Sequence, residues 1–251
     1  NNMENFIKIY PNSLSDEHCD YIMDLYKKHP EQTHVGKVGG GQVKKEFKHC
    51  TDLNLLKMSS CMPIGIKESP DYVYDNHLDK QVIPSIFKAA KKALTSYNRS
   101  FPMDSIGATG DWLKADTDEH IWKHFNTAIM LDPHSVLVKK YNKGDGYFNW
   151  HMDTSHIAAR NQSRCLITMW YLNDVEQGGE TEFKHFKTSL KPTKGSLVIF
   201  PATSQWLHRG KQPESNDKYI LNLWWCFRNP MVMEEFAHGQ THWATDEILR
   251  S

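Results

Sequence analysis

The chain has 251 residues, of which 39% are hydrophobic and 12% aromatic, and its 30 lysines and arginines balance 30 aspartates and glutamates. The apolar share is large enough for a substantial core, which excludes a chain that is disordered throughout. The balanced charge gives no electrostatic reason to expect a nucleic acid or an anionic membrane as partner. No apolar run approaches the roughly 20 residues that a membrane-spanning helix needs.

Five cysteines are odd in number, widely spaced and without a C-x-x-C pair: Cys19, Cys50, Cys61, Cys165 and Cys226. This pattern favours reduced thiols over a disulfide framework. The first residues show neither the basic nor the apolar segment of a secretory signal. We therefore expect a cytoplasmic protein.

The N-terminal half predicts a short strand and two helices. Phe6–Tyr10 alternates apolar and polar residues, as a half-buried strand does. Ser15 is a suitable N-cap for a helix that should end before Pro30. Residues 79–98 have an apolar stripe at helical spacing, whereas 107–124 is polar and expected to be irregular.

Two further segments are open to more than one interpretation. Gly36–Lys48 is rich in glycine and lysine, which is typical of a mobile basic loop and also of a lid over an active site. The tail after Pro230 is compatible with a terminal helix.

The C-terminal half consists of short β-type segments separated by glycine-rich turns, with no helical pattern between them. The predicted strands are Ser135–Tyr141, Tyr147–His151, Arg164–Leu172, Glu180–Lys184, Ser196–Phe200, Gln205–His208 and Lys218–Phe227. Such spacing indicates an antiparallel sandwich or barrel. We therefore expect one α+β domain over residues 1–251, with N-terminal helices supporting a β core at about 130–228.

The sequence His151-Met152-Asp153, followed by His208, predicts a metal site. Residues i and i+2 of a strand point to the same face, so His151 and Asp153 can reach one point. With a third ligand from another strand, two histidines and one carboxylate form the facial triad typical of non-heme Fe(II) that works with oxygen. In a chain with 14 histidines and 30 carboxylates, an H-x-D pair alone also occurs by chance.

Lys218 follows a turn segment ten residues after His208. A hairpin there would bring its ammonium group alongside His208, where it could pair with the far carboxylate of a dicarboxylate bound to the metal. Taken alone, Lys218 is better explained as a solvated surface residue, and its position relative to His208 reverses that interpretation.

Five ordered motifs resemble the prolyl 4-hydroxylase-like branch of the Fe(II)/2-oxoglutarate dioxygenases. They are YNKGDGYFNWHMD (141–153), RCLITMWYLNDVEQGGETEF (164–183), KGSLVIFP (194–201), LHRG (207–210) and KYILNLWW (218–225). The resemblance covers roughly residues 135–228. Its one departure is a spacing of three residues between Tyr147 and His151, one more than the family's pattern.

The resemblance implies a double-stranded β-helix, or jelly roll, with a role for nine residues. Three would be the Fe(II) ligands and catalytic centre: His151, Asp153 and His208. Three would bind 2-oxoglutarate: Lys218 at its distal carboxylate, with Tyr141 and Thr181 hydrogen-bonded to it. Three would lie on the substrate side: Tyr147, Arg164 and Trp224. Tyr147 and Trp224 have a plain alternative as aromatic residues of the sheet core.

The activity implied is hydroxylation of an unactivated C–H bond, most simply C4 of a prolyl residue in a peptide or protein, with release of succinate and CO2. Fe(II), 2-oxoglutarate and O2 are the expected cofactor and co-substrates, with ascorbate as a reductant.

The same scaffold could hydroxylate a free amino acid or another small molecule. Nucleic-acid demethylation is disfavoured by the neutral charge and by Lys218, because such relatives generally use arginine there. A catalytically inactive peptide-binding module is the non-enzymatic alternative. We expect no nucleic-acid or membrane partner, and the sequence leaves the oligomeric state open.

Overall fold

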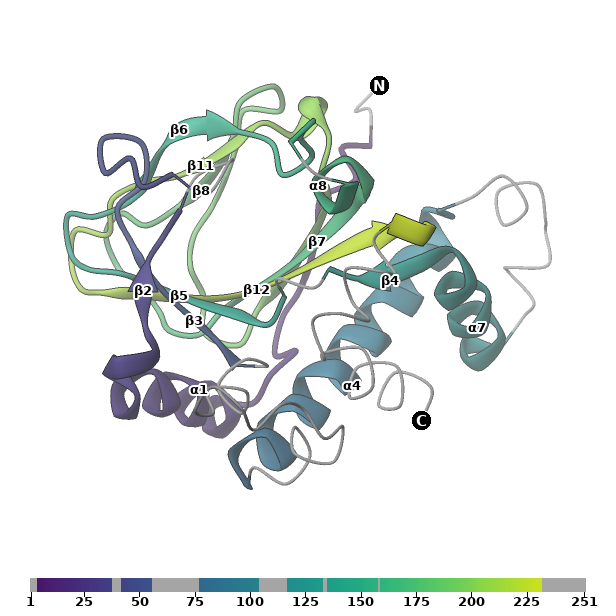
Figure 1. Cartoon of the computed structure of the whole chain (residues 1–251), viewed down its shortest axis with the longest axis horizontal. Helices are drawn as coiled ribbons and strands as arrows, with labels where there is room; N and C mark the ends of the chain where they lie inside the picture. The colour runs from purple at the N-terminus through teal and green to yellow at the C-terminus, as the bar shows by residue number, and fades with distance from the viewer. Residues whose placement is uncertain are drawn as a thin grey trace.

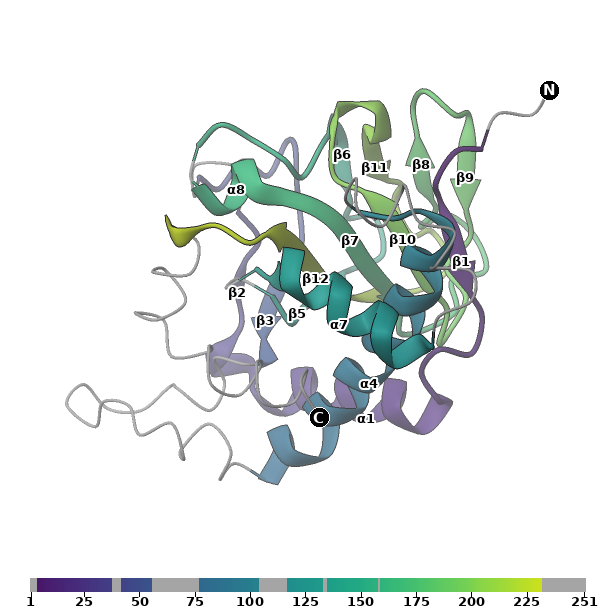
Figure 2. The same cartoon turned by 90° about the vertical axis from the view of Figure 1, so that its right-hand side faces the viewer.

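Two antiparallel sheets face each other, and helices cover the outer face of the larger one (Figures 1 and 2). The structure, a computed structural model, describes residues 4–37, 42–55, 77–103, 117–132, 135–157 and 159–231. The described helices are α1 (Asp16–Lys28), α4 (His77–Ser100), α7 (Asp118–Ala128) and the short α8 (Ala159–Ser163).

The larger sheet has eight strands, and every pairing in it is antiparallel. Its order is β1 (Lys8–Tyr10), β10 (Leu197–Pro201), β7 (Arg164–Tyr171), β12 (Lys218–Phe227), β5 (Leu137–Tyr141), β3 (Thr51–Asn54) and β2 (His34–Val35), with β4 (Ile129–Leu131) also paired to β12. The smaller sheet has the order β6 (Tyr147–His151), β11 (His208–Gly210), β8 (Thr181–Phe183) and β9 (Thr188–Leu190).

Strand β12 shows how the two-residue period of a strand separates two apolar cores. Ile220 and Trp224 belong to the cluster between the sheets, together with Phe183 of β8. Leu221 and Trp225, on the other face, pack with side chains of the helices. The larger sheet is thus buried on both faces, which explains why β12 reads as a nearly continuous apolar run.

The two predicted helices are present. Helix α1 starts after Ser15, whose side chain accepts a hydrogen bond from the backbone N–H of His18, and it ends before Pro30. Helix α4 buries its apolar stripe against the sheet: Val82, Ile83, Ile86, Phe87, Ala90 and Leu94.

Three predictions were wrong. The short helix α8 lies between β6 and β7, where no helix was expected. The supposedly irregular stretch ends in α7, which Thr117 caps by accepting a hydrogen bond from the backbone N–H of His120. Residues 204–206 form a 3₁₀ turn instead of the start of a strand, because the N–H groups of Trp206 and Leu207 bond back to carbonyls three residues earlier. The strand that carries the predicted ligand begins only at His208.

The described part of the Gly36–Lys48 segment lies against the edge of the smaller sheet. The N–H of Phe148 donates to the carbonyl of Phe47 at 2.9 Å, and Lys48 forms a β-bridge with Tyr147. Figure 1 shows this segment rising from β2 to β6. It therefore closes one side of the space between the sheets; residues 38–41 lie outside the described part, as does the expected tail helix at 232–251.

Four of the five cysteines fall in the described ranges, and all four are buried free thiols: Cys19, Cys50, Cys165 and Cys226. Cys61 lies outside those ranges. Within the described chain, no helix has both the length and the apolar composition that crossing a bilayer requires.

Leu221→Ala should lower the free energy of unfolding by about 2–5 kcal/mol, because the truncation leaves a cavity under the helices. The fully buried side chain of Leu221 packs in the core between sheet and helices. Urea denaturation measures the change, with Ile9→Ala as control, since Ile9 is 49% exposed and should cost less than about 1 kcal/mol. Equal costs for the two variants would contradict this description of the core.

Candidate active site

The pairing of β6 with β11 brings the three predicted metal ligands together. His151 lies directly opposite His208 in the register, and their ring centroids are 4.2 Å apart. Asp153 follows β6, and its Oδ2 lies 3.4 Å from Nε2 of His208. One ligand atom of each residue lies within 4.8 Å of the others, so the three can hold one metal ion.

Hydrogen bonds from the backbone and from Trp224 leave the right atoms of this triad available. Nδ1 of His151 bonds to the carbonyl of Asn149, and Nδ1 of His208 to that of Trp206, both at 3.0 Å. A carbonyl oxygen only accepts, so each ring carries its proton on Nδ1 and leaves the Nε2 lone pair free. Nε1 of Trp224 donates to Oδ1 of Asp153 at 3.2 Å, which leaves Oδ2 on the side of the histidines.

The electrostatic environment keeps His151 and Asp153 in the protonation states that bind a metal. Burial, followed by the charge of His208, lowers the pKa of His151 to about 3. Burial would raise the pKa of Asp153, but the neighbouring His208, His151 and Arg164 outweigh it and lower that pKa. The result is a neutral His151 imidazole beside an ionised Asp153 carboxylate, two ligands that suit Fe(II).

A cavity of about 790 Å³ between the two sheets contains the triad. All nine residues singled out from the sequence line it: Tyr141, Tyr147, His151, Asp153, Arg164, Thr181, His208, Lys218 and Trp224. Its volume is in the range of small-molecule sites.

Lys218 reaches this cavity by a different route from the one predicted. No hairpin joins it to His208, because β11 pairs with β6 and β8 whereas β12 belongs to the other sheet. Both side chains line the same cavity, one from each sheet. Lys218 is 3% exposed, and its Nζ donates to the carbonyl of Gly179 at 2.6 Å.

The ammonium group of Lys218 lies among aromatic rings and has no carboxylate within ion-pair distance in the described part of the chain. It is 5.5 Å from the ring centroid of Tyr141 and 5.6 Å from that of Tyr171. Burial lowers its pKa to about 8, against the weaker attraction of Glu180. A buried cation of this kind is suited to an anionic ligand. Thr181 is close by, with its Oγ1 accepting a hydrogen bond from Tyr171 at 2.7 Å.

Tyr147 stacks on His151 despite its unusual spacing. The ring centroids are 3.7 Å apart and the planes differ by 14°. The β6–β11 register shifts between His208 and Gly210, where four residues of β6 lie opposite two of β11. Four residues apart on one strand, Tyr147 and His151 remain on the same face.

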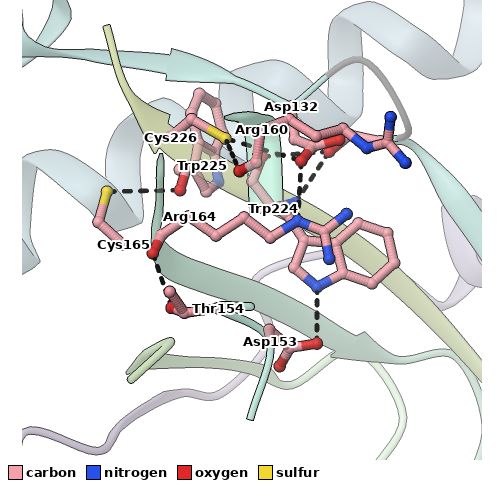
Figure 3. Close-up of polar contacts among 10 residues, drawn as sticks. Asp132, Asp153, Thr154, Arg160, Arg164, Cys165, Trp224, Trp225 and Cys226 are labelled. Carbon is pink, nitrogen blue, oxygen red and sulfur yellow. Dashed lines mark hydrogen bonds and ion pairs between the residues drawn. The ribbon is translucent and has the colours of Figure 1, made fainter. Parts of the chain in front are cut away.

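Arg164 and Trp224 form a chain of contacts that ends on the triad (Figure 3). Nε of Arg164 donates to Oδ2 of the fully buried Asp132 at 2.8 Å. The guanidinium lies 4.6 Å from the ring centroid of Trp224, whose N–H bonds to Asp153. Asp132 thereby fixes Arg164, which packs on the ring that orients a metal-facing carboxylate.

Sequence reasoning missed two polar features of the site. The first is Asp132, and the second is a group of charged residues in the cavity wall. Asp132 occurs in no motif, and its partner is 32 residues away. The second group consists of Lys48, Asp52 and Lys139, all buried. The only signal for it was the position of Lys139 two residues before Tyr141, on the same face of a predicted strand.

Residues 136–226 match the family model of the 2OG-Fe(II) oxygenase superfamily. A protein of Acanthamoeba polyphaga mimivirus named "Putative prolyl 4-hydroxylase" is 29% identical over 122 residues, which are 42% of this chain and 50% of that protein. The match thus spans half the length of this curated relative.

Two solved structures share the fold. A viral collagen prolyl hydroxylase from Paramecium Bursaria Chlorella virus-1, in complex with 2OG, has a TM-score of 0.53 at 21% identity, with 89% of this chain and 97% of that chain covered. A Trichoplax adhaerens prolyl hydroxylase, in complex with a peptide of hypoxia inducible factor, has a TM-score of 0.58 at 15% identity, with 88% and 84% covered. Residues 136–226 thus resemble the 2OG-Fe(II) oxygenase superfamily, a family that implies Fe(II), 2-oxoglutarate and O2, and the similar protein is named a prolyl 4-hydroxylase.

Chelator-treated protein should lose stability as the pH falls from about 6.5 toward 3. In this window the unfolded chain protonates His151 while the folded chain, with a pKa of about 3, does not. The free energy of unfolding should fall by up to about 1.4 kcal/mol per pH unit. Urea denaturation at several pH values measures the slope. His151→Gln removes this titration and should flatten it, whereas an unchanged slope would contradict the assignment.

Proposed function

We propose that this 2OG-Fe(II) oxygenase hydroxylates C4 of a prolyl residue in a peptide or protein and releases succinate and CO2. The observation that carries the proposal is the presence, in one cavity, of a His-Asp-His triad and a buried lysine without a carboxylate partner among the described residues. In this proposal the two facing antiparallel sheets are the halves of a double-stranded β-helix.

The metal ligands are Nε2 of His151, Nε2 of His208 and a carboxylate oxygen of Asp153. When bound, Fe(II) with 2-oxoglutarate and O2 supplies the oxidation of an unactivated C–H bond. The carbonyls of Asn149 and Trp206 hold the two imidazole rings in the orientation that turns Nε2 toward the metal.

Lys218 binds the distal carboxylate of 2-oxoglutarate, and Tyr141 and Thr181 hydrogen-bond to the same group. Burial destabilises the charged form of Lys218, and the ion pair with this carboxylate stabilises it again. Binding of 2-oxoglutarate therefore raises the pKa of the ammonium group. Tyr141 lies opposite Lys218 in the β5–β12 register, so the two act on one ligand from adjacent strands.

Tyr147, Arg164 and Trp224 surround the substrate side of the triad. Tyr147 covers one face of His151, and Trp224 fixes Asp153, so a substrate that contacts these rings lies beside the metal ligands. Because Arg164 is paired with Asp132, its role is to hold the ring of Trp224 in place, and it offers no unpaired charge to the substrate. The names of the similar proteins, a mimivirus prolyl 4-hydroxylase and an enzyme solved with a peptide, support a peptide substrate.

The alternative is hydroxylation of a free amino acid or another small molecule, which a cavity of about 790 Å³ would also accept. An inactive binding module is disfavoured, since such a module has no physical need for the complete triad together with Lys218.

Succinate formation from 2-oxoglutarate should be stimulated by a proline-containing peptide in the presence of Fe(II), ascorbate and air. Mass spectrometry should detect one added oxygen on that peptide. A panel of peptides provides the test, with the same reactions under argon as control. Slow succinate formation that no peptide stimulates would retain the oxygenase and replace the prolyl substrate by the small-molecule alternative.

Lys218→Ala should weaken 2-oxoglutarate binding by about 10- to 100-fold while leaving Fe(II) affinity nearly intact. Asp153→Ala should instead abolish Fe(II) binding, because it removes the charged ligand. Calorimetric titration under argon measures both affinities. Lys140→Ala is the matched control, since Lys140 pairs with Asp217 and does not line the cavity. Equal loss of metal and 2-oxoglutarate in Lys218→Ala would contradict its role.

A further inference from the structure

A second group of buried charges lines the cavity and has no part in the mechanism above. Lys48, Asp52 and Lys139 are 4%, 3% and 5% exposed. Nζ of Lys139 lies 3.3 Å and Nζ of Lys48 3.9 Å from the same oxygen of Asp52. Two buried ammonium groups thus share one carboxylate, which leaves one positive charge without a counterion in this cluster. Nζ of Lys48 also donates to the carbonyl of Lys37 at 3.0 Å.

The cluster lies on the inner face of the sheet, next to the substrate side of the triad. Lys139 of β5 faces Asp52 of β3 directly in the register. Its Nζ is 5.7 Å from the ring centroid of Trp224, and Nζ of Lys48 is 5.3 Å from that of Tyr147. Because Trp224 bonds to Asp153 and Tyr147 stacks on His151, a group held by the two lysines is one aromatic ring away from the metal ligands.

The cavity as a whole has a surplus of positive charge, although the chain has none. Seven cationic residues of the described chain line it: Lys37, Lys48, Lys139, Arg160, Arg164, Arg209 and Lys218. The lining has only two carboxylates, Asp52 and Asp153, and two more from outside it pair with Arg164 and Arg209. Arg160 has interactions of its own and is left out of the balance. The other six cations exceed these four carboxylates by two positive charges. Bound Fe(II) and the dianion of 2-oxoglutarate cancel, so the surplus persists in the loaded site.

We propose that Lys48 and Lys139, held by Asp52, form a subsite for a carboxylate of the substrate. This inference rests on the proposed function, since it names the chemistry that the same cavity selects. Lys48 and Asp52 lie outside residues 136–226, so the subsite combines one residue of the shared oxygenase domain with two from the N-terminal segment.

The electrostatics of Lys48 agree with this role. Burial and the neighbouring Lys139 lower its pKa to about 8, because Asp52 does not compensate both ammonium groups. A bound carboxylate supplies the missing counterion. That carboxylate has two sources, an acidic side chain next to the target proline or the α-carboxylate of a chain end or free amino acid.

Binding of short peptides under argon, with Fe(II) and 2-oxoglutarate present, tests the subsite without turnover. The probes are acetyl-Ala-Glu-Pro-Gly-amide, the same peptide with Gln for Glu, and the Gln peptide with a free C-terminus; L-proline and prolinamide test the free amino acid. We expect one carboxylate-bearing probe to bind about tenfold or more tightly than its neutral counterpart, and the probe that does so identifies the source.

Lys48→Met should reduce this preference to near unity, because it removes the surplus charge while the Lys139–Asp52 ion pair remains neutral and intact. Lys45→Met is the matched control: Lys45 is exposed on the same segment, and the preference should persist. Melting temperatures of both variants report whether they are folded.

Equal binding of every charged and neutral pair by the unaltered protein would overturn the subsite, and this readout does not depend on any variant. A preference for the charged probe that survives in folded Lys48→Met would overturn the subsite as well. So would a thymidine oligonucleotide that binds in place of the peptides and loses its binding in Lys48→Met. Exposure of the bound peptides to air separates the two proposals. Selective binding without oxygen transfer supports the subsite and overturns prolyl hydroxylation, whereas hydroxylation without selectivity does the reverse.

Discussion

The antiparallel pairing of β6 with β11 determines where the groups of the site lie. It sets His151 opposite His208, and the chain continues from β6 into Asp153, whose N–H bonds to the carbonyl of Ala202. The same strand presents Tyr147 to the ring of His151. A shift of one residue in this register would turn one histidine to the other face and separate the ligands.

The larger sheet forms the opposite wall of the cavity and holds charged side chains at fixed positions along its strands. Along its inner face, Lys218 is opposite Tyr141, and Lys139 is opposite Asp52 one step further. The helices on the outer face remove that side from solvent, so the strands in the middle of the sheet can hold buried lysines rigidly. Rigid placement matters because a buried ammonium group binds an anion without first giving up a hydration shell.

Much of the site could be predicted from the sequence because strands and ordered motifs carry strong local signals. The alternation around His151 placed Asp153 on the same side, and the motif order supplied His208 and Lys218 from more than 50 residues away. The predicted hairpin was wrong because local turn signals do not reveal that the chain crosses from one sheet to the other.

The residues that were missed depend on tertiary pairing. Asp52 lies on β3, a strand of four residues, which is too short for a recognisable period, and its partner Lys139 is 87 residues away. Asp132 precedes β5 in a short connection and acquires its role only through Arg164. Helix α7 was missed although Thr117 and the acidic residues after it form a standard start signal, because the polar stretch before it obscured the pattern.

The attachment of residues 42–50 to β6 has a consequence for how this scaffold can diversify. The segment contributes Lys48 to the cavity and bonds through its backbone to the strand that bears His151. Its exposed side chains can therefore change while its main chain cannot, because an insertion or deletion would displace the strand that bears His151. A substitution of Lys48 would change the charge of the cavity wall. The lining of the cavity can thus vary by substitution at one edge of the smaller sheet without any change to His151, Asp153 or His208.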